Sequence, residues 1–368
     1  MSTTSFSANS SSSWWGWRWR WGWRWRRWVG GNANATAINN QELSVNSNSL
    51  NISATATSFN GYSRASGIQT SNISFSGTSA RVNSYARGTS SDAFGLENST
   101  LTASSNKGAN INISATAVST SPYYWWYGRG SGPSTANGLS NSSVDTGAGN
   151  DSLNISASAS SYGYRSRYWW WGGYGGYGPA KAIAVNNNSK INTGDGNDRL
   201  SITANASDWL TGEAIGVRDS SINTGTGSDT IEISATGSRT SRSMSNSSLT
   251  TGDGCDSVTI NQGMSCSSIS LGDDDDTLTL GGYLSSDYTG NTFDGGDGTD
   301  KLVLSDFNSS ELNKLVDTFS YDSSSGSVSF NGNTFKGFEA VTLGTTDYKI
   351  ADFSSFDDVK KDFASAVS

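Results

Sequence analysis

The sequence predicts an all-β fold, a parallel β-solenoid of about nine coils, and three observations support this. Only 34% of the 368 residues are hydrophobic, while glycine is abundant (43) and proline is rare (3). The apolar residues alternate with polar ones in short β-rich runs, which argues against both a single large core and a disordered chain. A unit of this pattern recurs along most of the chain, as expected for coils that stack on one another.

One apolar anchor per unit aligns the repeat: Leu43, Ile73, Leu101, Val144, Ile191, Ile222, Leu249, Ile269 and Phe293. A second apolar residue precedes most anchors by five residues. A third follows by nine in every unit but one: Ile52, Val82, Leu153, Leu200, Ile231, Val258, Leu278 and Leu302, with Ile111 ten residues after its anchor. The unit length varies only after this third residue. We therefore expect one constant corner and an opposite corner that accepts insertions, in a rod about 40 Å long.

Asn or Asp recurs three residues before the anchor, which predicts a ladder of stacked side chains along a structural turn. The residues are Asn40, Asn98, Asn141, Asn188, Asp219 and Asn246.

Residues 1–31 form a Trp/Arg-rich N-terminal segment, whose first 13 residues we expect to be weakly structured. From Trp15 to Trp25 every odd position is Trp and every even one is Arg or Gly. This period of two predicts a docking strand with one Trp face and one Arg/Gly face. An exposed Trp face favours a neighbouring subunit, a lipid or a glycan as partner, and packing on the end of the solenoid is the alternative. The candidate contact residues are Trp15, Trp17, Trp19, Trp21, Trp23, Trp25, Arg18 and Arg20.

The predicted solenoid spans residues 32–304, and from residue 144 onward its coils carry a Gly-x-Gly-x-Asp turn or a near variant. The six turns span 147–151, 194–198, 225–229, 252–256, 272–276 and 296–300. The sequence from Gly295 to Val303 matches the nonapeptide GGxGxDxUx without a gap. Here the chain resembles the RTX (repeats-in-toxin) β-roll family. The resemblance implies a secreted bacterial surface protein that binds Ca²⁺.

The chemistry of these turns agrees with that implication. Glycine permits positive φ and exposes the carbonyl oxygens, and each Asp adds a carboxylate to the oxygen ligands that Ca²⁺ prefers. Six turns leave five gaps, so we expect about five ions in one row. A metal-free turn ladder is the alternative, but stacked carboxylates would repel one another without a cation. The candidate ligand positions are Gly147, Gly149, Asp151, Gly194, Gly196, Asp198, Gly225, Gly227, Asp229, Gly252, Gly254, Asp256, Asp274, Asp276, Gly296, Gly298 and Asp300.

Several turns depart from the nonapeptide. Four have Thr at its first Gly position: Thr146, Thr193, Thr224 and Thr251. The coil anchored at Ile269 has Leu271 there and Asp274 in place of the later Gly, so we expect a distorted site. The first three coils lack the motif Asp, and we expect no calcium in them.

Two long insertions are rich in aromatic residues and arginine, and they leave consecutive coils at the corner away from the glycine-aspartate turns. Their candidate partner-binding residues are Trp125, Trp126, Trp169, Trp170 and Trp171. A glycan, a lipid headgroup or a second copy of the chain would suit them, and the alternative is that they cover the flank of the solenoid. The acidic remainder of the chain disfavours a nucleic acid.

Residues 305–368 are expected to form a cap, with a short helix at 309–316 and a hairpin at 327–339 around Asn331-Gly332. By the RTX resemblance, the tail from Asp352 to Ser368 would be an uncleaved type I secretion signal. The first 13 residues lack the features of a cleaved signal peptide. No run of 18 apolar residues exists, so we expect no membrane-spanning segment.

The chain contains no histidine, which excludes Ser-His-Asp triads and HExxH zinc sites, and two cysteines, Cys255 and Cys266, are too few for a disulfide framework. We therefore expect no enzyme. Residues 14–28 hold five Arg and no acid, whereas residues 243–300 hold ten Asp and no Lys or Arg. This asymmetry favours a structural protein that assembles head to tail into extracellular fibres or a sheath. The alternative is a cell-surface adhesin that binds polysaccharide or lipopolysaccharide through its aromatic-Arg loops.

Overall fold

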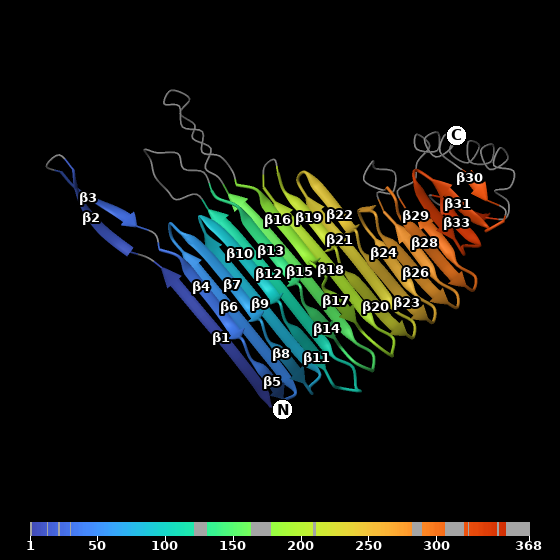
Figure 1. Cartoon of the computed structure of the whole chain (residues 1–368), viewed down its shortest axis with the longest axis horizontal. Coiled ribbons are helices and arrows are strands. Elements are labelled where there is room, and N and C mark those ends of the chain that lie inside the picture. Colours follow the sequence, from blue (N-terminus) through green and yellow to red (C-terminus); the bar gives the residue numbers. More distant parts are fainter. Residues whose placement is uncertain are drawn as a thin grey trace, which may run out of the picture.

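The structure, a computed structural model, describes residues 2–12, 14–20, 23–29, 31–120, 131–162, 178–208, 211–281, 289–305, 320–322, 324–343 and 346–350. The described residues form an all-β rod of parallel strands stacked coil upon coil, with no α-helix among them (Figure 1). The predicted parallel β-solenoid is confirmed. Within these ranges, no helix is long and apolar enough to cross a membrane.

Four sheets make up the described part of the chain. Sheet A runs in the order β1 (Thr3–Ser12), β6 (Ser49–Ser58), β9 (Ser79–Gly88), β12 (Asn110–Thr120), β15 (Ser152–Tyr162), β18 (Arg199–Ser207), β21 (Thr230–Gly237), β24 (Ser257–Ile260), β27 (Thr277–Leu280), β29 (Lys301–Leu304), β33 (Ala340–Leu343) and β34 (Thr346–Lys349). Sheet B is the pair β2 (Trp14–Arg20) and β3 (Trp23–Val29).

Sheet C runs in the order β4 (Ala33–Asn39), β7 (Tyr62–Gln69), β10 (Ser90–Glu97), β13 (Ser134–Ser140), β16 (Ala180–Asn186), β19 (Glu213–Arg218), β22 (Thr240–Ser245) and β25 (Gly263–Ser265). Sheet D runs in the order β5 (Glu42–Val45), β8 (Asn72–Phe75), β11 (Thr100–Ala103), β14 (Ser143–Asp145), β17 (Lys190–Asn192), β20 (Ser221–Thr226), β23 (Ser248–Asp253), β26 (Ser268–Asp273), β28 (Thr292–Asp297), β32 (Asn333–Lys336), β31 (Ser327–Phe330) and β30 (Ser320–Asp322).

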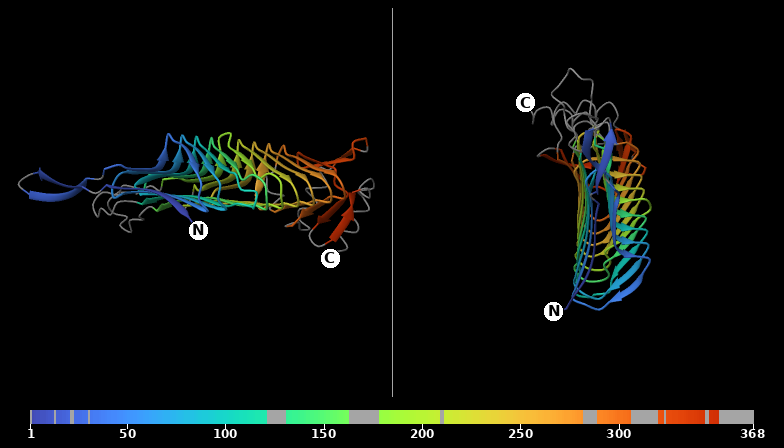
Figure 2. Two further views of the ribbon diagram at one scale, coloured as in Figure 1. Left: turned by 90° about the horizontal axis from the view of Figure 1, so that it is seen from below. Right: turned by 90° about the vertical axis from the view of Figure 1, so that its left-hand side faces the viewer.

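From β4 to β27, each coil passes through one strand of sheet C, one of sheet D and one of sheet A before the next coil begins. The end-on view shows two layers, with a narrow interior between them (Figure 2). The glycine-aspartate turns lie between sheets D and A, and the insertions lie between sheets A and C. Both aromatic insertions therefore leave the rod at one corner and the turns lie at another, as the unit lengths predicted.

The anchors of the repeat lie in register along sheet D, as predicted, from Leu43 opposite Ile73 to Ile269 opposite Phe293. The third apolar residue of the repeat was predicted wrongly in the first two coils. Leu50 and Ala80, not Ile52 and Val82, occupy that position in sheet A. The offset there is seven residues rather than nine, because the tight corners after β5 and β8 have no room for the longer glycine turn. A slip of two residues keeps the same face of a strand inward, so hydrophobicity alone cannot detect it.

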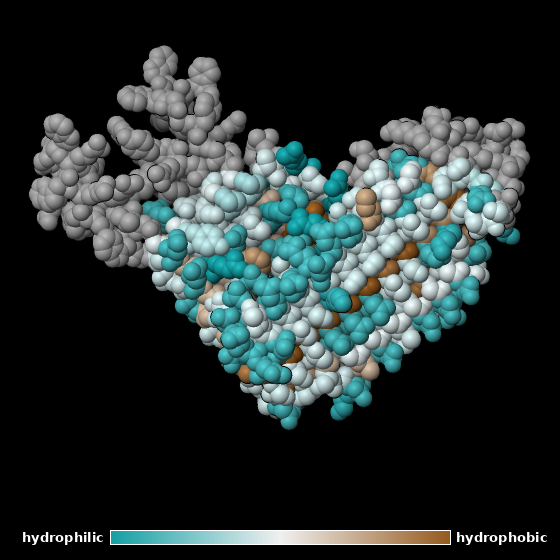
Figure 3. Space-filling model, viewed as in Figure 1, coloured by the Kyte–Doolittle hydropathy of each residue, from teal (hydrophilic) through white to brown (hydrophobic). Residues whose placement is uncertain are grey.

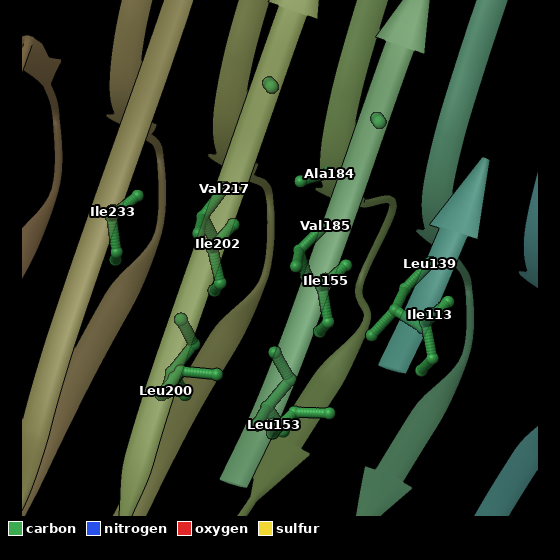
Figure 4. Close-up of a cluster of buried hydrophobic side chains, with 14 of the residues drawn as sticks. Ile113, Leu139, Leu153, Ile155, Ala184, Val185, Leu200, Ile202, Val217 and Ile233 are labelled. Atoms are coloured by element: carbon green, nitrogen blue, oxygen red, sulfur yellow. The ribbon is translucent and has the colours of Figure 1, made fainter. Parts of the chain in front are cut away.

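The side chains of the core become smaller across the rod, from the corner of the glycine-aspartate turns to the insertion corner. Nearest the glycine-aspartate turns, sheet A contributes two columns of large side chains, which include Leu153, Ile155, Leu200 and Ile202 (Figure 4). The next two columns are mostly Ala, and the column nearest the insertion corner includes the buried Ser119. Because small side chains allow close approach, the interior is thinner at the insertion corner.

Sheet C completes this narrow interior with glycines that face the Ile column. A Cβ on Gly138 would lie 2.6 Å from Cγ2 of Ile155 and 2.5 Å from the carbonyl oxygen of Ala184. Gly95 and Gly216 face Ile113 and Ile233 in the same way. These glycines leave space in sheet C for the isoleucines of sheet A. The repeat alignment had given them no role.

The corner between sheets C and D contains the predicted Asn ladder and a second ladder that was not predicted. Asn40, Asn98, Asn141 and Asn246 have positive φ there, and Nδ2 of Asn141 donates to Oδ1 of Asn98 over 2.9 Å. A buried serine ladder, which the alignment did not predict, lies beside it. The amide of Ser220 donates to Oγ of Ser247 over 3.3 Å, and the serines of most other coils repeat this bond.

The N-terminal segment differs from its prediction in two ways. Residues 3–12 are not weakly structured: β1 pairs with β6 along all ten residues, with Phe6 and Ala8 against the core. The Trp/Arg stretch forms an antiparallel hairpin, sheet B, instead of a single docking strand. In its register Trp17 lies opposite Arg26 and Arg18 opposite Trp25, so opposed positions combine the two residue types.

The repeat was expected to end at Leu304, but the two layers continue through the cap. β32 stacks on β28, with the Phe293 and Phe335 rings 4.7 Å apart, and β33 stacks on β29. The predicted Asn331-Gly332 hairpin is confirmed by β31 and β32, with positive φ at both turn residues. The predicted helix at 309–316 and the tail from Asp352 lie outside the described residues.

Candidate metal site

The six glycine-aspartate turns stack directly on one another at the corner between sheets D and A. Both glycines of each motif have positive φ, for example 101° at Gly225 and 118° at Gly227. The stacking is also too close for a side chain, because a Cβ on Gly225 would lie 1.9 Å from the carbonyl oxygen of Gly194. Glycine is thus required by the backbone conformation and by the close approach of the preceding turn.

The motif aspartates point into the rod and form a row. All six are at most 3% exposed: Asp151, Asp198, Asp229, Asp256, Asp276 and Asp300. One carboxylate oxygen of each accepts the backbone amide of the preceding coil, as from Asp198 to Asp229 over 2.8 Å and from Asp256 to Asp276 over 2.7 Å. Charge-assisted bonds of this kind fix the position of each carboxylate.

The second oxygen of these carboxylates has a different environment. Oδ2 of five of the six is buried without a hydrogen-bond partner: Asp198, Asp229, Asp256, Asp276 and Asp300. In Asp151, the first of the row, Oδ2 accepts the hydroxyl of Thr146. Thr193 lies beside the Asp198 carboxyl, but its hydroxyl donates to the carbonyl of Thr224 over 3.0 Å. A buried carboxylate oxygen with no donor is costly, so each of the five needs a proton or a cation.

The environment of the row also changes its acidity. Burial raises the pKa of Asp198, Asp256 and Asp300 to about 6, and that of Asp276 to about 7. Repulsion between neighbouring carboxylates adds to this effect, as Asp256 and Asp300 do on Asp276. The row therefore favours its neutral form until a positive charge is supplied.

The turn of the coil anchored at Ile269 retains the geometry of its neighbours. Asp274 replaces the second glycine but still adopts a positive φ of 82°. Its amide donates to Asp297 over 2.8 Å, and Asp276 remains in the row. The backbone of this turn therefore stacks like its neighbours, although a non-glycine residue at this φ is strained, and the distortion of a metal site in this coil stays a prediction.

The residues present fit a hard cation. Among the described residues no group of three or more His, Cys, Asp or Glu side chains is placed to hold a metal ion by itself, so a cation here would be held by Asp carboxylates together with main-chain carbonyls of the turns. The main-chain carbonyls of the turns and the five unpartnered Oδ2 atoms supply that donor chemistry. The first three coils contribute no Asp to the row; the amide of Ala109 donates to Asp151, where the row begins.

A second, exposed row of acids follows the same corner. Asp253, Asp273 and Asp297 lie in register on adjacent coils, and Asp274 and Asp275 are exposed beside them. We call these five residues the acidic rim. The alignment had assigned Asp274 to the metal row, but its side chain is exposed and belongs to this rim.

The remaining candidate residues lie elsewhere. Trp15, Trp17, Trp19, Trp23, Trp25, Arg18 and Arg20 are on sheet B, and Trp21, Trp125, Trp126, Trp169, Trp170 and Trp171 lie outside the described residues. Cys255 and Cys266 are free and exposed. Cys255 follows the end of β23 and Cys266 precedes the start of β26, its neighbour in sheet D, so the length of a strand, about 20 Å, separates them, which is too far for a disulfide bond.

Comparison with known proteins gave no match to a family model, to a curated protein or to a solved structure. The RTX resemblance therefore rests on the turn residues alone.

Sequence reasoning missed the function of the turn threonines. Thr146, Thr193, Thr224 and Thr251 are fully buried. The hydroxyls of Thr193, Thr224 and Thr251 donate to the carbonyl of the next coil, and that of Thr146 shares its proton between the Thr193 carbonyl and Oδ2 of Asp151. The signal was present, because the same residue type departs from the motif in four of six turns. It indicates a second ladder parallel to the aspartates.

Proposed function

We propose that the chain is a secreted, calcium-stiffened structural rod that assembles head to tail into extracellular fibres or a sheath. The observation that carries this proposal is the row of five buried Oδ2 atoms without a donor. A divalent cation between adjacent turns would neutralise the row and join each coil to the next. Calcium supplies exchangeable coordination to oxygen, which suits a site built from carboxylates and carbonyls.

The flanks of the rod support a structural role for it. Only Phe59 and Tyr162 are exposed large hydrophobic residues among those whose side chains are described. The face in Figure 3 shows mainly hydrophilic and neutral residues, crossed by a narrow row of hydrophobic ones.

The two ends of the rod differ, which supports a directional assembly. Among the described strands, β1, β4 and β5 are the first of sheets A, C and D, whereas antiparallel β30 and β34 end sheets D and A. Sheet B projects beyond the first coil (Figure 1). Residues 14–28 hold five Arg and no acid, whereas the acidic rim lies within a stretch that has no Lys or Arg. The basic hairpin of one copy and the acidic rim of the next are complementary in charge.

Electron microscopy of purified protein tests the proposal. With millimolar Ca²⁺ we expect filaments, and in excess chelator we expect none. A variant that lacks residues 14–28 should remain monomeric while it still folds with calcium. Filaments that persist after this deletion would contradict docking by the hairpin, and loss of attachment to cells or glycans without a change in assembly would instead favour the adhesin.

A further inference from the structure

Glu339 occupies the position of the motif aspartates one coil beyond the last glycine-aspartate turn. The amide of Asp300 donates to Oε2 of Glu339 over 2.7 Å, which is the bond that each aspartate makes with its successor. The amide of Ala340 donates to the carbonyl of Asp300 over 3.1 Å, and Ala340 pairs with Lys301 in sheet A. Glu339 thus makes the hydrogen bond of the row from a seventh position, although no Gly-x-Gly-x-Asp motif marks it and its side chain, unlike those of the buried aspartates, is exposed.

The space beside Asp300 differs from that in the preceding turns. Gly295 takes the place that Thr146, Thr193, Thr224 and Thr251 hold in their own turns. Without that side chain, two oxygens approach one point: a Cβ on Gly295 would lie 2.7 Å from Oδ2 of Asp300 and 2.0 Å from the carbonyl oxygen of Gly337. A threonine here would fill the space that these oxygens border.

The donor set at this point suits a cation. Oδ2 of Asp300 is buried without a partner, and Asp300 is fully buried. Glu339 lies close enough that its charge raises the pKa of Asp300. Among the described residues at this end, Lys301 is bound to Asp347 and Lys336 to Asp294. Neither Asp300 nor Glu339 forms an ion pair with a described residue.

We propose that Asp300, Glu339 and the Gly337 carbonyl bind a further Ca²⁺ ion, beyond the five gaps of the motif turns, that fastens the cap to the rod. This inference rests on the proposed calcium row. It assigns a metal-binding role to Glu339, a residue outside every motif turn. Because β31, β32 and β33 have few other charged links to the rod, the ion would make the order of the cap depend on calcium.

The variant Glu339→Gln tests this directly. Glutamine keeps an oxygen that can accept the Asp300 amide but removes the charge. Native mass spectrometry counts ions on compact, folded chains, so unfolded protein does not affect the result. At calcium levels that saturate the wild type, we expect the variant to hold one ion fewer. The control Glu42→Gln, an exposed carboxylate on β5, should bind as many ions as the wild type.

Hydrogen exchange provides a second, local measurement. Calcium should protect residues 327–343 in the wild type, and in Glu339→Gln this protection should fall to the calcium-free level while coils 144–304 stay protected. An unchanged ion count together with unchanged protection would overturn the inference and leave the calcium row intact. A wild type that binds no calcium would overturn both.

Discussion

The amide of Asp229 donates a hydrogen bond of 2.7 Å to Oδ1 of Asp256 in the next coil, while Oδ2 of Asp256 has no donor. The two oxygens of one carboxylate therefore have separate roles. Oδ1 holds the register of the coils, and Oδ2 is left for a proton or a cation. The stability of the rod should therefore depend on whether a proton or a cation lies at these oxygens.

Without a cation, the rod should become less stable as the pH rises. The pKa of Asp276 is about 7 in the folded chain, and those of Asp198, Asp256 and Asp300 are about 6, all above the ordinary value of 3.8. A raised folded pKa gives stability that is complete below the unfolded pKa and is lost as the pH rises to the folded pKa. Thermal unfolding in chelator should therefore show a melting temperature that falls between about pH 4 and pH 7.

Calcium should reverse this trend, because it binds the ionised row. At pH 8 the melting temperature should rise on addition of roughly 0.1–1 mM Ca²⁺, the range of extracellular modules. Asp208, whose carboxyl accepts four hydrogen bonds that lower its pKa, titrates below this window and does not disturb it. Identical pH profiles with and without calcium would rule out a cation in the row.

Asp256→Asn should have opposite effects in the two conditions. The amide oxygen can still accept the Asp229 amide, and the new Nδ2 can donate to the nearby Thr251 hydroxyl oxygen, whose own proton bonds to Leu271. In chelator at pH 8 the variant should be more stable by about 1–3 kcal/mol, since about 1.4 kcal/mol accompanies each unit of pKa. With calcium it should lose at least one ion and melt below the wild type.

The matched control for that variant is Asp253→Asn, which removes the same charge from the same turn but at an exposed position. It should change neither the ion count nor the melting temperature by much. If both variants behaved alike, net charge rather than the buried row would explain the result. Calorimetry and native mass spectrometry provide the two measurements.

The glycines of sheet C that face the isoleucines of sheet A give a prediction about packing. Gly138→Ala should destabilise the rod by about 1–3 kcal/mol, because the new methyl group meets Ile155 and a carbonyl of the adjacent strand. Gly31→Ala is the control, since the nearest atom to its added methyl group would be Cβ of Ser12 at 3.4 Å. Denaturant unfolding in calcium measures both. Equal stability of the two variants would show that the layers can separate slightly at no cost.

The coils could be predicted from the sequence because every coil repeats the same pattern of residues. The anchors needed only one apolar residue per coil, and the motif turns needed glycine at defined positions. The same patterns could not set the register of Leu50 and Ala80, because a shift by two residues leaves a strand equally amphipathic. β1 was missed for a related reason: it has only Phe6 and Ala8 as inward apolar residues, and β6 supplies the pairing that makes it a strand.

The positions of the carboxylates in the row could be predicted from the sequence, but their hydrogen bonds and their exposure could not. Spacing identified six aspartates, yet only the stacked structure separates Oδ1 from Oδ2 and moves Asp274 to the exposed rim. Glu339 could not be found by motif, because its side chain reaches the row from a turn of different sequence. The pairing of β2 with β3 could not be predicted either, because a period of two fits a single strand and a hairpin equally well.

Assembly should depend on the acidic rim if the basic hairpin binds it. The triple variant Asp253→Asn, Asp273→Asn and Asp297→Asn removes three charges that lie in register, and these side chains are exposed, so folding should be unaffected. We expect filaments to be lost or at least tenfold less abundant with saturating Ca²⁺. Filaments of the wild type should also dissociate as salt rises from 0.05 to about 0.5 M, because ions screen exposed charges beyond roughly 10 Å at 0.1 M.

A control for this variant removes three charges elsewhere: Asp92→Asn on β10, Glu213→Gln on β19 and Glu232→Gln on β21. The net charge then changes equally while the rim is intact, so filaments should form as in the wild type. Sedimentation of each protein, followed by electron microscopy of the pellet, compares them. Loss of filaments in the control as well would mean that overall charge drives assembly, and full filaments in the rim variant would show that the hairpin binds another surface.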